Sequence, residues 1–347
     1  MFSANSIPER MRALIYGTSG PDKLVWRSVH KVTQPGKGQV VIKVEAASLN
    51  PYDIQVTESQ SLFRRYKGQP AGRDFAGTIV ALGPGVHSFS VGEKVFGLAP
   101  GCAQYTIADT HRIEKIPDDG EMKDFGAIGF TGAVAYQILA RHWLDRPDYS
   151  IRNLLVIGAS GGVGSATIQI ARALGGPELI IYGICSAKNC HFVQGIGATH
   201  SLDYSLSEFN LSKILPARSV DLIIDVVSGI HGGPNYVPEG MNLLKPAGRY
   251  VALNSTSFSE WIRAYMTESC GCNVQRSHYD LFTVNQSRPA RSLHAVANLV
   301  KERKLKPFIS REVHLAEAPL RRALHSVKQG HTRGKILVIP EQHSTVV

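Results

Sequence analysis

A glycine-rich segment, Val156–Gly164, constrains the fold more strongly than any other part of the sequence. It overlaps the end of a short apolar run, Leu154–Ile157, and precedes apolar residues that recur at helical spacing as far as Leu174. A glycine loop that joins a buried strand to a helix is typical of dinucleotide-binding α/β domains. A tight strand–helix turn without a ligand is the alternative, and the flanking strand and helix favour the dinucleotide.

The glycine loop offers a dinucleotide both space and positive charge. Gly161 lets the backbone approach a pyrophosphate, and Gly164 permits close packing of the helix on the strand. The N-terminus of the helix presents N–H groups and a partial positive charge to phosphate. The predicted cofactor-binding residues of the loop are Ala159, Ser160, Gly161, Gly162, Val163 and Gly164.

The segment after the next apolar strand predicts which dinucleotide binds. NAD-binding domains carry an acidic residue about 20 residues beyond the loop, where it holds the ribose 2′-hydroxyl. Gly183–Asn189 contains no acid, whereas Ser186 can donate a hydrogen bond to a 2′-phosphate and Lys188 can supply positive charge. We therefore predict NADPH rather than NADH, with a solvated lysine as the alternative for Lys188. Tyr204 is a second candidate phosphate contact, although packed surface tyrosines are commoner, and Asn254 follows a later strand at the edge that faces the cofactor.

The rest of the chain divides into a β-rich start and an α/β middle. Short apolar runs separated by Gly and Pro, between Met11 and Ile107, indicate a compact barrel or sandwich. From Asn153 onward, strand patterns alternate with helical ones, which indicates a parallel sheet with crossover helices. Helices are expected at Ala127–Leu139, Ser292–Lys304 and Ala318–Gln329, and a last strand at Gly334–Ile339.

Composition and charge exclude several classes of protein. Of 347 residues, 43% are hydrophobic and 19% are charged, which suits folded domains rather than disorder. No apolar run approaches the roughly 20 residues of a membrane-spanning helix. Five cysteines without a CxxC pair do not make a disulfide scaffold, and they favour a reducing, cytoplasmic location, with a mitochondrial one as the alternative. The net charge of +10 favours anionic ligands without choosing among them.

Several further motifs resemble the medium-chain dehydrogenase/reductase superfamily and, within it, the zinc-free NADPH:quinone oxidoreductase (zeta-crystallin-like) branch. The segments that carry the resemblance are Ser48–Asp53, Gly72–Gly77, Val91–Val95, Phe130–Tyr136, the glycine loop and Gly334–Val338. Each motif alone is weak, but their order and spacing together are specific. The resemblance extends from about Met11 to Pro340, nearly the whole chain.

The resemblance implies an α/β protein of two domains. Residues 1–126 and 286–347 would form a GroES-like β-domain, the catalytic domain. Residues 127–285 would form a Rossmann domain, a doubly wound parallel sheet that binds NADPH. The resemblance also implies an active site in the cleft between the domains and the return of the C-terminal strand to the first domain.

The ligands of the zinc alcohol dehydrogenases in this superfamily are missing. Zinc sites need thiolate or imidazole donors. Asn50 stands where the first cysteine ligand would be, Arg73 and Asp74 replace a His-Glu pair, and Cys102 alone lies where a structural zinc would need four cysteines. We expect no metal. Without a Lewis acid, the protein must polarise its substrate by hydrogen bonds, which favours an electrophilic acceptor such as a quinone or an activated alkene.

The predicted catalytic residues are Asn50, Tyr52 and Thr131. By resemblance, Asn50 and Thr131 lie near the nicotinamide and its ribose or phosphate. Tyr52 would hydrogen-bond the acceptor oxygen, and Asp53 would anchor the loop. The predicted substrate contacts are Tyr52, Phe63 and Tyr66. The aromatic rings of Phe63 and Tyr66 suit a flat acceptor such as a quinone.

Three activities stay open. An NADPH-dependent quinone reductase is the first, and an enone or 2-alkenal reductase with the same hydride geometry is the second. The third is a cofactor-binding protein with little turnover that binds a partner or RNA, although basic clusters are usually solvated and we do not expect nucleic-acid binding. An enoyl-thioester reductase is disfavoured because Gln55–Ser61 lacks the tyrosine of that branch. We also expect a homodimer, since the open edge of a Rossmann sheet tends to be paired or covered.

Overall fold

The computed structural model describes residues 7–17, 24–58, 64–146, 149–229, 233–255, 257, 260, 278–282, 289–330 and 332–340. The chain forms two compact units: unit 1 contains Met1–Ala133 and Gln286–Val347, and unit 2 contains Val134–Asn285. The first boundary follows Ala133, inside helix α3 (Met122–Leu139), and lies seven residues beyond residue 126, where the sequence prediction places it. Phe63, a predicted substrate contact, lies outside the described residues.

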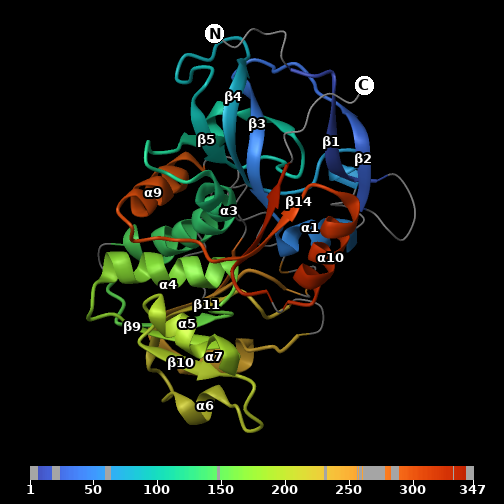
Figure 1. The fold of residues 1–347 in the computed structure, drawn as a ribbon. Helices are drawn as coiled ribbons and strands as arrows, with labels where there is room; N and C mark the ends of the chain where they lie inside the picture. Colours follow the sequence, from blue (N-terminus) through green and yellow to red (C-terminus); the bar gives the residue numbers. More distant parts are fainter. Residues whose placement is uncertain are drawn as a thin grey trace. The chain divides into compact units, whose positions relative to one another are not determined.

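Unit 1 is built on a seven-stranded sheet with the order β14-β15-β3-β4-β5-β7, in which β6 also pairs with β3. A separate two-stranded sheet joins β1 and β2 (Figure 1). The strands of the unit are β1 Arg10–Tyr16, β2 Leu24–Lys31, β3 Gln39–Ser48, β4 Phe75–Leu82, β5 Lys94–Gly97, β6 Tyr105–Asp109, β7 Ile113–Lys115, β14 Ile309–His314 and β15 Lys335–Ile339. This β-rich unit confirms the GroES-like domain that the resemblance implies.

The last strand of the chain returns to the first unit. β15 pairs with β3 in antiparallel register, with Leu337 opposite Ser48, and with β14 in parallel on its other side. The hydrophobic core of the unit accordingly combines residues from both ends of the chain, such as Ile42 and Val338, which are fully buried. The return predicted from the resemblance is therefore confirmed.

The helices of unit 1 begin with one that the sequence analysis did not expect. The segment Ser48–Asp53 turns into α1, with Pro51 in its first position, where proline costs no hydrogen bond. An Asp53 carboxylate oxygen accepts a hydrogen bond of 2.9 Å from the Asn50 N–H, in the manner of a capping box. The bounds of the unit's helices, apart from α3, are α1 Pro51–Glu58, η2 Thr110–Arg112, α9 Ala290–Lys301 and α10 Glu317–Lys328.

Unit 2 is built on six parallel strands in the order β10-β9-β8-β11-β12-β13. Its elements are η3 Ala140–Leu144, β8 Asn153–Ile157, α4 Gly162–Gly175, β9 Ile180–Cys185, η4 Ala187–Asn189, α5 Cys190–Gly195, β10 His200–Asp203, α6 Leu211–Ile214, β11 Val220–Asp225, α7 Val237–Leu243, β12 Leu244–Ala252 and β13 Tyr279–Leu281. Renumbered along the chain, this order is 3-2-1-4-5-6, the doubly wound order of dinucleotide-binding sheets. The Rossmann domain is therefore confirmed.

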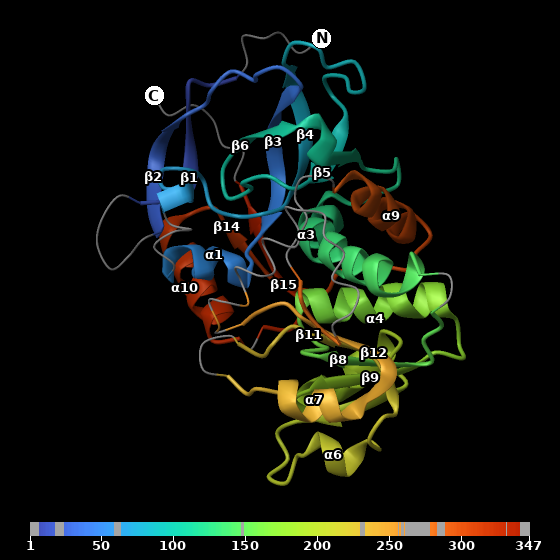
Figure 2. The same cartoon turned by 180° about the vertical axis from the view of Figure 1, so that it is seen from behind.

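Helices cover both faces of the parallel sheet. Figure 1 shows α4 on one side of the strands and α7 on the other, and the view from behind in Figure 2 agrees. The central strand β11 is buried along its whole length. A strand covered on both faces reads as a continuous apolar run, and this is why Leu154–Ile157 and its neighbours were visible in the sequence.

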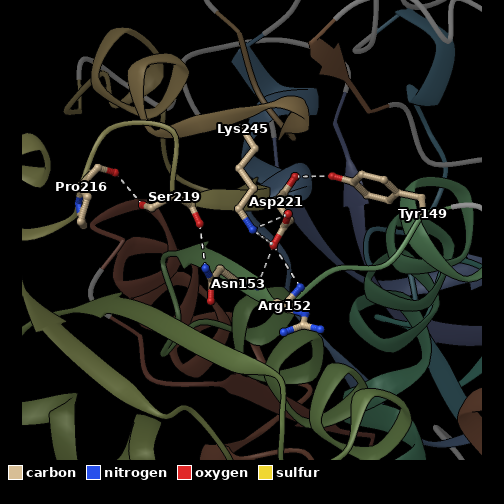
Figure 3. Close-up of polar contacts among 7 residues, drawn as sticks. All are labelled: Tyr149, Arg152, Asn153, Pro216, Ser219, Asp221 and Lys245. Atoms are coloured by element: carbon tan, nitrogen blue, oxygen red, sulfur yellow. Dashed lines mark hydrogen bonds and ion pairs between the residues drawn. The ribbon is translucent and has the colours of Figure 1, made fainter.

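A polar cluster fixes the amino ends of three strands of this sheet (Figure 3). The Asp221 carboxylate accepts hydrogen bonds from the backbone N–H groups of Arg152 (3.0 Å) and Asn153 (2.9 Å) and from the Lys245 ammonium (2.9 Å). The Tyr149 hydroxyl donates to the Asp221 carbonyl oxygen at 2.6 Å. These contacts tie the starts of β8, β11 and β12 together, so we interpret the cluster as structural.

Five strands escaped the sequence analysis: β2, β7, β10, β13 and β14. β10 and β13 lie at the two edges of the unit 2 sheet, and β14 is an edge strand of unit 1. Edge strands carry polar residues on their exposed sides, so they lack a continuous apolar run. Leu174 lies within α4, as its helical spacing predicts, but it is 44% exposed in the last turn of the helix.

Candidate cofactor and acceptor sites

The glycine loop makes a tight turn between β8 and α4. Gly158 adopts the left-handed region at φ +83°, and a Cβ there would lie 2.5 Å from a Val226 methyl group. The N–H groups of Gly158 and Ala159 donate to the Ile184 carbonyl oxygen at 3.2 and 2.9 Å. A Cβ on Gly164 would lie 2.2 Å from the Gly158 carbonyl oxygen. Glycine is therefore required at Gly158 and Gly164 by the fold itself.

Gly161 differs from those two glycines. Its φ is −78°, and a Cβ there would meet only the Gly158 carbonyl oxygen, at an ordinary 3.5 Å. It is the N-cap residue of α4, and no side chain caps this helix end. The fold therefore tolerates a side chain at Gly161, and the open space beside it, together with the uncapped helix N-terminus, fits the phosphates of a dinucleotide.

The loop sits at the point where the strand order of the sheet reverses. β8 lies between β9 and β11, so the crossovers leave it in opposite directions. Ligands of doubly wound sheets bind outside the carboxyl ends of the strands at this switch point. Ala159, Ser160, Gly161, Gly162, Val163 and Gly164 all follow the carboxyl end of β8. Unit 2 thus places all six predicted loop residues at this edge of the sheet.

An asparagine that the sequence analysis did not single out joins this loop to the next one. The buried Asn189 donates from Nδ2 to the hydroxyl oxygens of Ser160 and Ser186, each at 3.1 Å. Ser186 follows β9 and is half-buried, while Lys188 is exposed. Asn189 is the last residue of Gly183–Asn189, the segment from which the cofactor preference is predicted. That position is the sequence signal that could have revealed it.

The last residue of β10, Asp203, and the next residue, Tyr204, also lie at this edge of the sheet. Tyr204 is 43% exposed, and its N–H donates to the Cys185 carbonyl oxygen at 3.1 Å. Asp203 accepts hydrogen bonds from the N–H and hydroxyl of Ser205, at 2.9 and 2.6 Å, and from the N–H of Ala187. These bonds lower the pKa of Asp203. The Asp203 carboxylate therefore accepts hydrogen bonds from the segments that follow β9 and β10.

The loops after β11 and β12 also approach each other at this edge. A Cβ on Gly229 would lie 2.9 Å from the Ser255 backbone and 3.0 Å from that of Asn254, so the predicted cofactor contact Asn254 is held by a close backbone approach. The fully buried Asp225, at the end of β11, accepts from the N–H of Val227 at 2.9 Å and from the Tyr250 hydroxyl. The sequence signal that could have revealed Asp225 is an acidic residue at the end of an apolar strand.

In unit 1, the Asn50 amide is fully engaged. Asn50 is 1% exposed and donates to the Asp74 carboxylate at 3.1 Å and to the Ser48 carbonyl oxygen at 3.3 Å. Its Oδ1 accepts from the buried Lys335 ammonium at 2.5 Å, and Lys335 also donates to the Leu49 carbonyl oxygen at 3.0 Å. Burial lowers the pKa of Lys335, and the nearby Asp74 opposes that shift. Asn50 is therefore part of a buried polar network.

Thr131 is also occupied by local contacts. It is 4% exposed in α3, and its hydroxyl donates to the Ala127 carbonyl oxygen one turn earlier, at 3.4 Å. The N–H of the preceding Phe130 donates to Asp74 at 3.1 Å, so Asp74 joins this part of α3 to the Asn50 network. Asp74 therefore links the Asn50 side chain to the Phe130 backbone, next to Thr131 in α3.

Tyr52 and Tyr66, whose rings meet edge-on with centres 6.5 Å apart, both lie against a buried arginine. The Arg73 guanidinium carbon is 4.2 Å from the centre of the Tyr52 ring and 4.1 Å from that of Tyr66. Arg73 is 8% exposed, and within the described residues its Nε and Nη2 atoms have no hydrogen-bond partner. Asp53, which accepts hydrogen bonds from the Tyr16 hydroxyl and the Gly72 N–H, is a carboxylate that interacts electrostatically with Arg73. The structure thus brings both described substrate candidates to one cation.

The electrostatics of the two tyrosines differ. Burial raises the pKa of Tyr52 to about 12, although Arg73 opposes the shift. Burial also acts to raise the pKa of Tyr66, but the Arg73 charge and the hydrogen bond with Tyr52 outweigh it and lower that pKa overall. Tyr66 is consequently the readier proton donor of the pair.

Two family models match the chain. The alcohol dehydrogenase GroES-like domain matches residues 36–144, and the zinc-binding dehydrogenase family matches residues 196–338. The human protein named quinone oxidoreductase is 30% identical over 253 residues, which cover 71% of this chain and 73% of that protein. The chain belongs to the medium-chain dehydrogenase/reductase superfamily. It is thus an oxidoreductase of a superfamily that uses nicotinamide dinucleotides.

Other members of the superfamily extend the comparison. A trans-enoyl reductase of Aspergillus terreus is 26% identical and covers 87% of this chain, which covers 86% of that protein. The solved structure of the quinone oxidoreductase from Coxiella burnetii is 25% identical, with a TM-score of 0.76, and covers 95% of this chain and 99% of its own.

The name of the second family model raises the question of zinc. Among the residues that the structure describes, no group of three or more His, Cys, Asp or Glu side chains is arranged to hold a metal ion. The metal-free chemistry expected for this member of the superfamily stays a prediction. Within the same described ranges, no helix is both long enough and apolar enough to cross a membrane.

Proposed function

We propose that this member of the superfamily is an NADPH-dependent, zinc-independent quinone reductase. The observation that carries the cofactor assignment is the loop after β9, where Ser186 and Lys188 follow the strand end without an acid between Gly183 and Asn189. Asn189 holds Ser186 and Ser160 together, so the 2′-phosphate and the pyrophosphate would be bound by joined loops. The names of the relatives support the acceptor class.

Unit 2 would bind the pyrophosphate of the cofactor through backbone N–H groups and its 2′-phosphate through side chains. The α4 N-terminus would bind the pyrophosphate beside Gly161, and Ser186 and Lys188 would bind the 2′-phosphate. The Asp203 carboxylate accepts hydrogen bonds from Ser205 and from the Ala187 N–H, so it would hold the segment that carries Ser186 and Lys188 against the end of β10. Tyr204 and Asn254 would contact the adenosine and nicotinamide halves respectively.

Unit 1 would supply the groups that act on the acceptor. NADPH, when bound, supplies the hydride, and negative charge then develops on the acceptor oxygen. Arg73 is a permanent positive charge that favours this anion, and Tyr66 and Tyr52 carry the hydroxyl groups that would donate to it. Asn50 would act as a positioning residue, because Lys335 and Asp74 already engage its amide. Thr131 follows Phe130, whose N–H donates to the same Asp74 carboxylate, and would have the same role.

The test is a paired titration with NADPH and NADH, followed by steady-state oxidation with 1,4-benzoquinone, 9,10-phenanthrenequinone and a 2-alkenal. We expect NADPH to bind about 100-fold more tightly than NADH, because two charge-assisted contacts to the 2′-phosphate are worth about 3 kcal/mol. We expect the quinones to turn over fastest. A preference for NADH would contradict the cofactor assignment.

The second candidate is an enone, 2-alkenal or enoyl reductase, which the similarity to a trans-enoyl reductase favours. The same residues would protonate the reduced alkene or its enolate. A kcat/KM for the alkenal above that for both quinones would select this candidate and reject the first.

The pH dependence of turnover tests the role of Tyr66. A proton donor must be protonated, so turnover should fall as pH rises through the pKa of Tyr66, which lies below the ordinary tyrosine value. Tyr66→Phe should lower kcat roughly 100-fold and remove this alkaline limb. Tyr52→Phe should shift the limb to higher pH, because it removes a hydrogen bond that lowers the Tyr66 pKa. An unchanged limb in Tyr66→Phe would exclude Tyr66 as the donor.

A further inference from the structure

Two cysteine thiols meet at the loop that carries the proposed 2′-phosphate contacts. Cys185 ends β9 and Cys190 begins α5, and their sulfur atoms lie 3.8 Å apart. The Cys190 thiol also approaches the Ser186 carbonyl oxygen at 3.8 Å. A disulfide has an S–S length of about 2.05 Å, so the two sulfur atoms would need to approach by less than about 2 Å to bond.

The environments of the two thiols assign them different roles. Cys185 is 1% exposed, whereas Cys190 is half-buried and accessible to a small oxidant. Burial raises the pKa of Cys185 to about 12, with Cys190 as the next cause. Reactivity with oxidants follows thiolate character and access, so Cys190 reacts first and Cys185 resolves the product.

The chain between the two cysteines contains the residues on which the proposed cofactor preference depends. Ser186, Lys188 and Asn189 all lie inside the ring that a Cys185–Cys190 disulfide would close. Asn189 precedes Cys190 directly, and its amide bridges the Ser160 and Ser186 hydroxyls at 3.1 Å each. Drawing Cys190 toward Cys185 would therefore displace this bridge.

We propose that Cys185 and Cys190 are a redox modification site, in which a hydroperoxide forms a disulfide that weakens binding of the 2′-phosphorylated cofactor. The effect on the cofactor rests on the proposed function, whereas the disulfide itself does not. The displacement falls on the contacts to the 2′-phosphate, so NADH binding should change little.

The chemistry balances with hydrogen peroxide as the oxidant. The Cys190 thiolate attacks one peroxide oxygen, the O–O bond breaks, and after protonation of the leaving hydroxide the products are Cys190 sulfenic acid and water. The Cys185 thiol then displaces hydroxide from the Cys190 sulfur, its proton goes to that hydroxide, and a second water leaves. In total, two thiols are oxidised to one disulfide and one peroxide is reduced to two waters.

Trypsin gives a direct readout of the bond. Lys188 lies between the two cysteines, so cleavage after it separates residues 173–188, which contain Cys185, from residues 189–213, which contain Cys190. In the peroxide-treated full chain, mass spectrometry without reductant should find these two peptides joined, and dithiothreitol should part them. The fully buried Cys102 should stay a thiol and serves as an internal control. Cys270 and Cys272 fall in another tryptic peptide.

Cofactor affinity measures the consequence. After removal of peroxide, the Kd for NADPH should rise about tenfold, the equivalent of one lost charge-assisted hydrogen bond, with the Kd for NADH nearly unchanged. Cys190→Ser should bind NADPH like the reduced wild type and should not respond to peroxide. Cys185→Ala should also form no linked peptides. This second variant keeps the test valid if serine at Cys190 disturbs α5.

The outcomes separate the two proposals. Absence of linked peptides in oxidised protein overturns the modification site, and linked peptides with an unchanged ratio of NADPH to NADH affinity overturn the regulatory effect. A reduced protein that does not prefer NADPH overturns the proposed cofactor and with it the effect, while the peptide result still decides whether the disulfide forms.

Discussion

The two ends of the unit 2 sheet use similar polar residues in opposite ways. At the amino ends of the strands, Asp221 accepts three hydrogen bonds, and Asn153 donates from Nδ2 to the Ser219 carbonyl oxygen at 2.7 Å (Figure 3). At the carboxyl ends, α4 begins without a side-chain cap beside an open glycine. At the amino end, the Asp221 carboxylate and the Asn153 Nδ2 are bonded within the protein, although Asn153 Oδ1 has no partner among the described residues, whereas the carboxyl end leaves N–H groups for a ligand. The difference shows that hydrogen-bond satisfaction, rather than polarity, distinguishes a structural cluster from a binding site.

The largest effect should come from breaking the amino end. Asp221→Ala leaves two backbone N–H groups and the Lys245 ammonium without their acceptor, at a site only 7% exposed. We expect a loss of about 3 kcal/mol in the free energy of unfolding, measured by urea denaturation. NADPH affinity of the folded protein should be unchanged. A weakened affinity at full stability would show that the two ends are not separate in function.

The second test uses two glycines of the same loop. Gly164→Ala places a methyl group 2.2 Å from a carbonyl oxygen, so it should lower both stability and affinity. Gly161→Ala meets only an ordinary contact, so its free energy of unfolding should change by less than about 0.5 kcal/mol. Its NADPH affinity should nevertheless fall at least tenfold, roughly 1.4 kcal/mol, because the methyl group enters the space of the pyrophosphate. Full affinity in Gly161→Ala would place the phosphate elsewhere.

The third test separates charge from packing at the carboxyl end. Lys188 is exposed, so Lys188→Ala should leave stability within about 0.5 kcal/mol of the wild type. The ratio of NADH to NADPH Kd should fall about tenfold, and the remaining NADPH affinity should depend less on salt. Lys213→Ala, another lysine of unit 2 but distant in sequence, is the control. Equal ratios in the two variants would argue against a 2′-phosphate contact.

The smallest effects should come from a matched pair of asparagines at the two ends. Asn153→Ala removes the bond to Ser219 and should cost about 1 kcal/mol of stability with unchanged affinity. Asn189→Ala removes the bridge between Ser160 and Ser186 and should weaken NADPH binding about threefold. Calorimetry and NADPH titration of both variants measure the two quantities. The comparison fails if both substitutions act on the same quantity.

Prediction from the sequence succeeded where one local pattern determines the structure. The run Leu154–Ile157, the glycine loop and the apolar spacing of α4 predicted a strand, a turn and a helix, because each depends on neighbours in the chain. The edge strands β10 and β14 were missed because their polar residues show no burial pattern.

The sequence was less informative about partners that lie far apart in the chain. Lys335 and Asn50 are separated by 285 positions, and no spacing rule predicts that an ammonium and an amide will meet. The same holds for Asn189 and Ser160, and for Arg73 between its two tyrosines. Candidate residue types could be found from the sequence, but whether each contacts a ligand or a neighbour depended on the tertiary fold.

The pairing of β15 with β3 has a consequence for how the protein is made. A ribosome releases all of Val134–Asn285 before it adds Lys335–Ile339, so unit 2 can fold while unit 1 still lacks a strand of its sheet. Until then, the Ala47–Ser48 end of β3 lacks its partner strand, and the Leu49 and Asn50 oxygens lack the Lys335 ammonium. Unit 1 can therefore complete its sheet only after all of unit 2, which is inserted into its sequence, has been synthesised. A nascent chain that stops before Lys335 should leave this end of β3 unpaired and available for binding by chaperones.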